Sequence, residues 1–238
     1  MRFALATLIL LQAAPVQSEA DKLEAALKKF GNRTYRILIE GEQVGTCSLK
    51  TRIDKEGARP VAVCEDRFSV TMGGEEVTMT TTERASLDRL RLVSSKMIGK
   101  VGGKETPVTI AVDGRKATMT FEDRTPIFDI TDATVGEQAV IRLVCAAEQK
   151  EGAEFKVDVL NMTTGTFQPG HAFKCVAKEQ IEIGGKKVDA FKWEQKGEWG
   201  DGKPPTSKTT VHNVYWVSPD GYLLRNVGRG GEIVLDAK

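Results

Sequence analysis

The stretch PVTIAVDGRKATMTF, residues 107–121, decides the fold. Apolar and polar side chains alternate on both sides of a central Asp-Gly pair, as in two β-strands joined by a tight turn. A two-residue Asp-Gly loop places Ile110 opposite Ala117 and Val108 opposite Met119, so that these side chains share one face. The stretch therefore predicts an antiparallel hairpin with one buried face.

The same pattern continues on both sides of this hairpin. From Tyr35 onward, apolar residues recur at every second position, and glycine-centred turns interrupt the runs. The expected strands include 43–51, 60–70, 154–162, 171–183, 186–196, 208–217 and 222–228. We expect a mainly β fold in which about ten strands form a long antiparallel meander, curled into an incomplete barrel.

Two segments depart from the strand pattern. Residues 21–30 carry apolar side chains at helical spacing between Asp21 and Gly31, which predicts a short N-terminal helix. Residues 132–148 place apolar side chains four apart, with Asp132 as an N-cap, and predict a second helix. A buried strand over 138–146 is the alternative for this segment.

The N-terminus has the character of an export signal. Arg2 precedes an apolar run over 3–14, and small residues follow it. Cleavage after Ala20 or after Ser18 fits this pattern. We therefore expect a signal peptide over residues 1–20, a single β-rich domain over 21–238, a periplasmic or secreted location, and no stable membrane span after cleavage.

Four cysteines lie beyond the expected signal. An even number of cysteines in an exported chain favours disulfides. A hairpin folded about residues 55–56 places Cys47 opposite Cys64, close enough to bridge with small adjustment. Cys145 and Cys175 remain as a second pair. Four buried free thiols are the alternative interpretation.

Composition and motifs disfavour several functional classes. The net charge is +1, without the basic excess that is usual in nucleic-acid-binding proteins. The two histidines, His171 and His212, have no partners at metal-ligand spacing, and no Gly-x-Ser-x-Gly or Cys-x-x-Cys motif occurs. We expect a non-enzymatic protein without a cofactor or a nucleic-acid partner. A hydrolase that uses His171 or His212 is the least favoured alternative.

Aromatic residues gather in the C-terminal half. The segment VHNVYWV, residues 211–217, is apolar on both faces, so both faces need a cover. An aromatic core is the simpler interpretation, and an apolar ligand cavity inside a curled sheet is the sharper one. The candidate ligand-binding residues are Phe173, Phe191, Trp193, Tyr215 and Trp216.

The order of several motifs resembles a family of uncharacterised bacterial exported proteins. These motifs are YRILIEGEQVGTCSLKT (35–51), LDRLRL (87–92), VDGRKATMTF (112–121), ITDATVGEQAVIRL (130–143) and VYWVSPDGYLLR (214–225). The resemblance implies an incomplete β-barrel similar to those of periplasmic lipoprotein carriers, which hold acyl chains. It implies no catalytic residues.

These expectations lead to two functional hypotheses. The first is an exported envelope protein that shelters an apolar small molecule, a lipid or a protein segment within a curved sheet. The second is a structural or interaction module of the envelope, which binds another protein through a sheet face or edge.

Overall fold

The computed structural model describes residues 18–57, 59–196, 211–228 and 231–236. The elements are α1 (Glu19–Phe30), β1 (Asn32–Ile39), β2 (Glu42–Glu56), β3 (Arg59–Met72), β4 (Glu75–Ser86), β5 (Leu92–Val101), β6 (Lys104–Asp113), β7 (Lys116–Phe121), β8 (Ile127–Asp129), β9 (Thr134–Gly136), α2 (Glu137–Ala146), β10 (Glu154–Asn161), β11 (Thr166–Ile183), β12 (Lys186–Lys196), β13 (Val211–Val217), β14 (Leu223–Gly228) and β15 (Gly231–Leu235). The expected signal over 1–20 falls largely outside the described residues.

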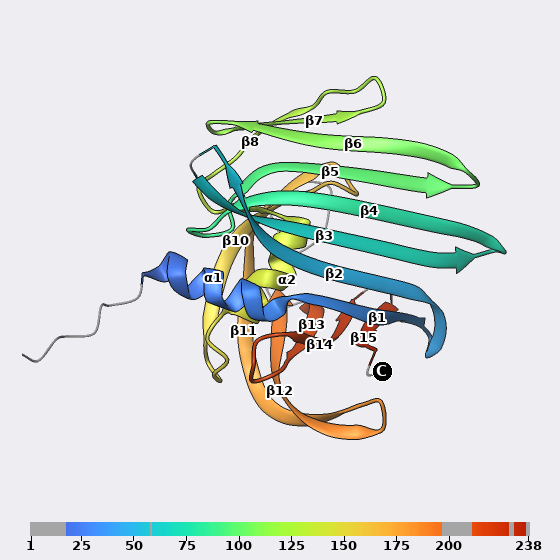
Figure 1. The fold of residues 1–238 in the computed structure, drawn as a ribbon, viewed down its shortest axis with the longest axis vertical. Helices are drawn as coiled ribbons and strands as arrows, with labels where there is room; N and C mark the ends of the chain where they lie inside the picture. Colours follow the sequence, from blue (N-terminus) through green and yellow to red (C-terminus); the bar gives the residue numbers. More distant parts are fainter. Residues whose placement is uncertain (1–17, 58, 197–210, 229–230, 237–238) are drawn as a thin grey trace, which may run out of the picture.

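One sheet contains all fifteen described strands (Figure 1). Its order is β8-β7-β6-β5-β4-β3-β2-β1-β15-β14-β13-β12-β11-β10-β9, so two meanders meet where β1 pairs with β15. Neighbouring strands run antiparallel except β9 and β10, which run parallel. The two edge strands, β8 and β9, follow each other in the sequence, yet they do not pair. The predicted incomplete barrel is therefore confirmed, although the sheet has fifteen described strands rather than about ten and includes one parallel pair.

The hairpin over residues 107–121 forms, but its register differs from the prediction. Ile110 lies opposite Met119 rather than Ala117, and Val108 lies opposite Phe121. The loop consists of Gly114 and Arg115, and Gly114 takes φ 58°, which suits glycine as the first residue of a type II′ turn. A shift of two residues leaves each side chain on its predicted face, so the buried face was predicted correctly.

Helix α1 begins two residues earlier than predicted. Ser18 and Asp21 form a capping box, in which the Ser18 hydroxyl accepts a hydrogen bond from the Asp21 amide and Asp21 bonds back to Ser18. Leu27 and Phe30 are buried against the sheet and α2. The predicted cleavage positions lie within this capped first turn.

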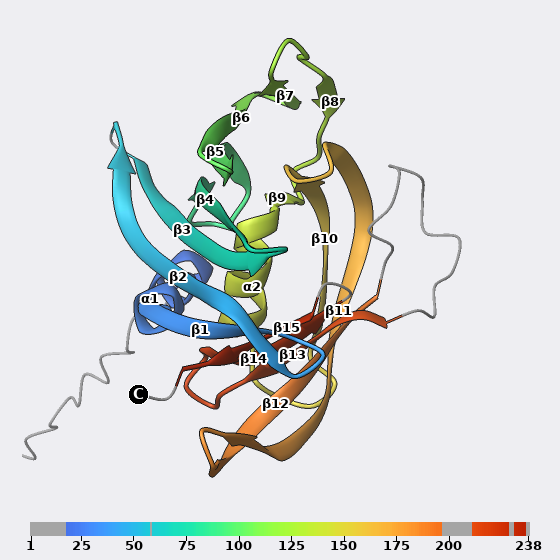
Figure 2. The same ribbon diagram turned by 90° about the vertical axis from the view of Figure 1, so that its right-hand side faces the viewer.

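Helix α2 confirms the predicted second helix but begins later. Residues 134–136 form β9, and Asp132 does not cap the helix; its carboxylate contacts Arg91 and Arg115, each at 3.2 Å. Figure 2 shows α2 inside the space that the curved sheet encloses. None of the helices that the structure describes has the length and continuous apolar character of a membrane-spanning segment.

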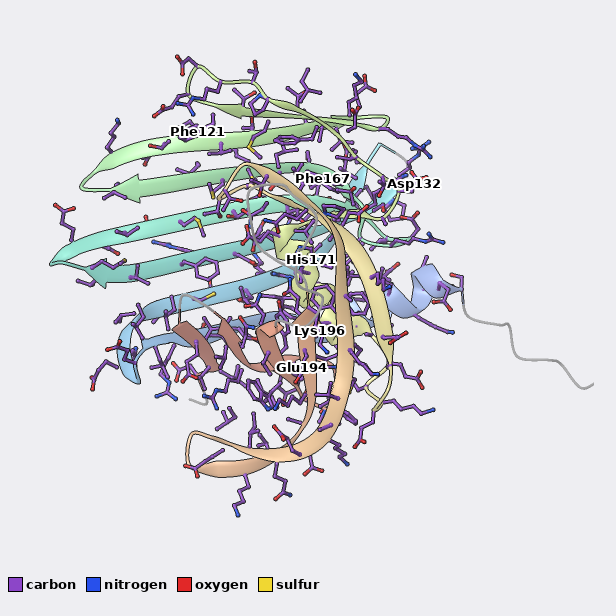
Figure 3. The ribbon with its side chains drawn as sticks, turned by 180° about the vertical axis from the view of Figure 1, so that it is seen from behind. Phe121, Asp132, Phe167, His171, Glu194 and Lys196 are labelled. Atoms are coloured by element: carbon purple, nitrogen blue, oxygen red, sulfur yellow. The ribbon has the colours of Figure 1, made fainter. Side chains whose placement is uncertain are left out.

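The residues that the structure describes form three apolar clusters. The largest joins α1 and α2 to the concave face of the sheet and includes Phe30, Tyr35, Leu49, Phe173 and Trp193. A second cluster lies at β5–β7 and the end of β10; Phe121 and Phe167, labelled in Figure 3, pack against it. A third cluster unites Ile183 and Ala190 of the β11–β12 hairpin with Leu224 and Val234.

Candidate ligand-binding site

The middle of α2 is fixed to the sheet by one buried ion pair. Arg142 binds the two carboxylate oxygens of Asp66 on β3 through its two terminal guanidinium nitrogens, Nη1 and Nη2, and both side chains are fully buried. The remaining donors of Arg142 reach the Thr51 hydroxyl and the carbonyl oxygens of Gln138 and Lys50, each at 3.1 Å. All five guanidinium N–H donors are therefore used. Burial lowers the pKa of Arg142, but the acidic groups around it, Asp66 foremost, together outweigh burial and raise that pKa above its ordinary value.

A carboxyl group from the sheet caps the N-terminus of α2. The Glu83 carboxyl oxygens on β4 accept hydrogen bonds from the backbone amides of Gln138 (3.2 Å) and Ala139 (3.1 Å). Gly136, the N-cap residue, provides no side-chain cap, and a Cβ there would lie 2.0 Å from the Glu83 carboxyl oxygen. Burial raises the pKa of Glu83 to about 8, against the two amide hydrogen bonds and Arg142.

The C-terminus of α2 is also fixed. The Gln149 amide donates to the carbonyl oxygens of Val144 (3.0 Å) and Ala147 (2.8 Å), and its oxygen accepts from the Trp193 indole at 3.0 Å. Sheet contacts thus hold the helix at both ends and at its middle. We conclude that α2 is held rigidly and forms one fixed wall of the barrel interior.

A cavity of about 390 Å³ lies between α2 and the concave face of the sheet. Its apolar lining includes Phe68, Met79, Val140, Ile141 and Ile233, and its polar lining includes Glu137, Asn161, Thr163, Asn213, Tyr215 and Asn226. This size and mixture are typical of small-molecule sites, in which an apolar wall carries a few polar groups.

A second cavity, of about 270 Å³, adjoins the first. Thr163 and Thr164, in the turn between β10 and β11, line both cavities. Three methionines, Met97, Met119 and Met162, contribute to the second lining together with Val108 and Phe121. Flexible methionine side chains adapt to ligands of different shape.

The concave face continues beyond α2 as apolar surface. Cross-strand rows under the helix, such as Asp66–Thr81, are buried. The next rows, Phe68–Met79 and Val70–Val77, are only half-buried, although they lie on the same face. Gly99 of β5 lies opposite Met79 on the same face. The space above Gly99 is open, since a Cβ there would meet only the Thr106 carbonyl oxygen, at 3.9 Å.

A network of polar side chains lies beside the first cavity, and two of its members, Asn213 and Tyr215, line that cavity. The Gln195 oxygen accepts hydrogen bonds from the Tyr215 hydroxyl (2.7 Å) and the Asn213 amide (2.9 Å), and the Gln195 nitrogen lies 2.8 Å from Nδ1 of His171. In Figure 3, His171 is labelled on β11, which passes in front of α2 in this view. His171 is buried in this network.

The five predicted ligand-binding residues have different surroundings. Phe173 and Trp193 are fully buried in the aromatic core, and Phe155 stacks on Phe173 with ring centroids 4.7 Å apart. Of the five, Tyr215 lines the 390 Å³ cavity, and none lines the 270 Å³ cavity. Phe191 is half-buried against the main cluster.

Trp216 lies on the opposite face of β13 from Tyr215. Its indole donates to Glu179 at 2.6 Å, and its ring lies below the Arg225 guanidinium at 5.1 Å. Its neighbours belong to the third cluster, outside the cavities. Among residues 213–217, Tyr215 and Val217 are buried on one face, and Trp216 packs against the third cluster on the other.

The predicted disulfides are wrong in this structure. All four cysteines are buried free thiols. The β2–β3 hairpin extends to the pair Glu56–Arg59, so Cys64 lies opposite Thr51 and Cys47 lies opposite Phe68. The turn was predicted at residues 55–56, two residues before its position in the structure. Each residue of β2 therefore lies opposite a different residue of β3 from the one predicted.

The alternative of a hydrolase depended on two histidines. His171 is buried in the network with Gln195, and the side chain of His212 lies outside the described residues. Within the part of the chain that the structure describes, no group of three or more His, Cys, Asp or Glu side chains is arranged to hold a metal ion.

Sequence reasoning missed the charged residues of α2. Arg142 interrupts the apolar run of α2 after Gln138, and Glu137 precedes that run; this was the available signal. A charged side chain on the inner face of a helix needs a partner across the core. The partner of Arg142, Asp66, lies 76 positions away, so the spacing could not identify it.

Comparison with known proteins supports the fold. The chain is similar to the crystal structure of a β-barrel-like protein of the domain of unknown function DUF1849 from Brucella abortus. The match has a TM-score of 0.53 and 10% sequence identity, and covers 86% of this chain and 95% of that chain. Comparisons with protein-family models and with curated proteins gave no match. The likeness confirms a β-barrel-like fold and extends no further.

Proposed function

We propose that this protein is an exported carrier that binds a ligand with an apolar chain between α2 and the concave face of its sheet. The observation that supports this proposal most strongly is the pair of adjoining cavities, of about 390 and 270 Å³, beneath an apolar face that continues past the helix. The export signal read from residues 1–20 suggests the periplasm or the exterior as its place of action.

The rigidity of α2 supports this proposal. A helix held by Glu83, Arg142 and Gln149 cannot readily move into the cavities and fill them. The opposite wall is adaptable, because methionines line much of the second cavity. Apolar side chains left half-exposed on a concave face bury more surface when an apolar ligand binds.

A fluorescence titration tests the proposal. The neutral dye N-phenyl-1-naphthylamine gains fluorescence in apolar surroundings, and we expect saturable binding to the wild-type protein. Gly99→Trp places a large ring on the cavity face, and we expect at least about a tenfold weaker affinity. Lys100→Trp is the matched control, because adjacent strand residues point to opposite faces.

The two variants separate cavity binding from surface adsorption. Equal affinity in Gly99→Trp and in the wild type would contradict binding at the concave face. A dye signal lost equally in both variants would indicate a general effect of tryptophan on the strand, and would also count against the proposal. Circular dichroism confirms that each variant keeps its β structure.

A second candidate function is contact with another envelope protein. Three hairpin tips at one end of the sheet carry exposed apolar residues, Ile39, Met72 and Val101, with exposed fractions of 37%, 58% and 50% (Figure 1). Exposed apolar residues that gather in one place are typical of interaction surfaces. A stoichiometric partner that co-purifies with the wild type and is lost in the double variant Met72→Glu/Val101→Glu would favour this candidate.

A further inference from the structure

The interior of the barrel contains more carboxyl groups than cations. Asp66 and Glu83 of the sheet contact α2, Glu137 belongs to α2, and Arg142 is the one buried Lys or Arg among the described residues. Arg142 is committed to Asp66, and the Glu83 carboxyl group binds the amides of the helix N-terminus. Glu137 therefore has no cationic partner within the described part of the chain.

Glu137 faces the larger cavity. It is the first residue of α2, and it carries the one carboxyl group among the residues that line the 390 Å³ cavity. Its described hydrogen bond comes from the Thr163 hydroxyl, at 3.3 Å. The other polar groups of the lining are amides and hydroxyls, such as Asn161, Asn226 and Tyr215, whose oxygens accept hydrogen bonds.

The surroundings of Glu137 disfavour its charged form. Burial raises the pKa of Glu137 to about 7, the Thr163 hydrogen bond opposes the change, and the Asp66 carboxylate adds to it. Glu83 on β4 and Tyr215 on β13 are further ionisable groups near this end of α2. A cation placed in the cavity would stabilise the Glu137 carboxylate, to which the Thr163 hydroxyl now gives one hydrogen bond.

We infer that the ligand carries a positively charged ammonium group, which binds Glu137, and an apolar chain that lies along Val140, Met79 and the methionine-lined second cavity. This inference rests on the proposed function and specifies the ligand class for the same site. Thr163, which lines both cavities and bonds to Glu137, marks the point where the charged head meets the chain.

Displacement of the bound dye tests the inference. Dodecylammonium and dodecan-1-ol share one chain and differ in charge. At about pH 8.5, where Glu137 is mostly ionised, we expect dodecylammonium to displace the dye at about a tenfold lower concentration than the alcohol, as one charge-assisted hydrogen bond predicts. At about pH 5.5 the alkylammonium stays charged while Glu137 is protonated, so the preference falls.

Two variants make the test specific. Glu137→Gln keeps the shape and an acceptor for Thr163, and we expect it to remove the preference for the ammonium at both pH values. Glu148→Gln removes an exposed carboxylate just beyond the same helix and should retain the preference. A preference that survives in Glu137→Gln, or an alcohol that binds as well as the ammonium in the wild type, overturns the inference and leaves the proposed function standing. Failure of the dye itself to bind contradicts the proposed function instead.

Discussion

At the scale of single residues, the stability of the molecule depends on whether each charged group inside the barrel has an ion-pair or hydrogen-bond partner. Arg142 satisfies every one of its donors, Asp66 lies beside it, and the Glu83 carboxyl group accepts two amide hydrogen bonds at the start of α2. Buried charges are tolerated only when such partners exist. These three side chains are consequently structural, while Glu137 is left to the cavity.

Removing the buried cation should destabilise the fold. Arg142→Met leaves the Asp66 carboxylate buried and unpaired, and we expect a loss of about 3–5 kcal/mol in the free energy of unfolding. The double variant Arg142→Met/Asp66→Leu removes both charges and should recover most of that loss. Urea unfolding of both variants measures the difference; a double variant less stable than the single one would contradict this account.

The buried Glu83 side chain should make stability depend on pH. Its folded pKa, raised from 4.5 to about 8, means that the folded protein holds the proton more tightly than the unfolded chain. Stability is therefore lost as the pH rises from 4.5 through about 8, by an amount on the order of a few kcal/mol. Glu137 acts in the same direction up to about pH 7.

The variant Glu83→Gln isolates this effect. The glutamine oxygen can still accept from the α2 amides, but it has no proton to release. We expect unfolding free energies measured between about pH 5 and about pH 8.5 to fall less steeply for the variant than for the wild type. Parallel curves for the two proteins would show that Glu83 does not titrate in this range.

At the scale of elements, hydrophobic periodicity predicted which segments form strands and which faces they bury. The strands over 154–161 and 186–196, and both helices, were predicted from the sequence with small errors at their ends. Register was predicted less well, because a turn shifted by two residues preserves every face and changes every partner. The hairpin β6–β7 kept its buried face in this way, while the hairpin β2–β3 lost its predicted disulfide.

Thiol counting tests the register of the β2–β3 hairpin. We expect iodoacetamide to alkylate all four cysteines when the chain is unfolded without reductant, as intact-mass measurement will show. In the folded protein the reaction should be slow, because burial raises the pKa of Cys64 and of Cys145 to about 12 and leaves little thiolate. Fewer than four alkylated cysteines after unfolding would indicate that disulfides are present and would contradict the four free thiols.

At the scale of the whole molecule, two meanders that start from the paired β1 and β15 curl round α2 until their edges face each other (Figure 2). The sequence indicated this curl and the presence of a helix. It could not indicate the cavities, because the lining of the first comes from β3, β4, α2, β13 and β15 together, and that of the second from β5, β6, β7 and the turn after β10. Of the five aromatic residues predicted to bind a ligand, Phe173, Phe191 and Trp193 pack in the main cluster and Trp216 lies on the other face, while Tyr215 lines the first cavity.

Methionine methyl NMR tests the central claim most directly, because four of the six methionines, Met79, Met97, Met119 and Met162, line the two cavities. Met72, which is 58% exposed at the tip of the β3–β4 hairpin, is an internal control. Titration of the ¹³C-methyl-labelled protein with dodecylammonium should shift the signals of these four methyl groups and leave that of Met72 unchanged. Shifts confined to Met72, or none at saturating ligand, would contradict a ligand site on the concave face.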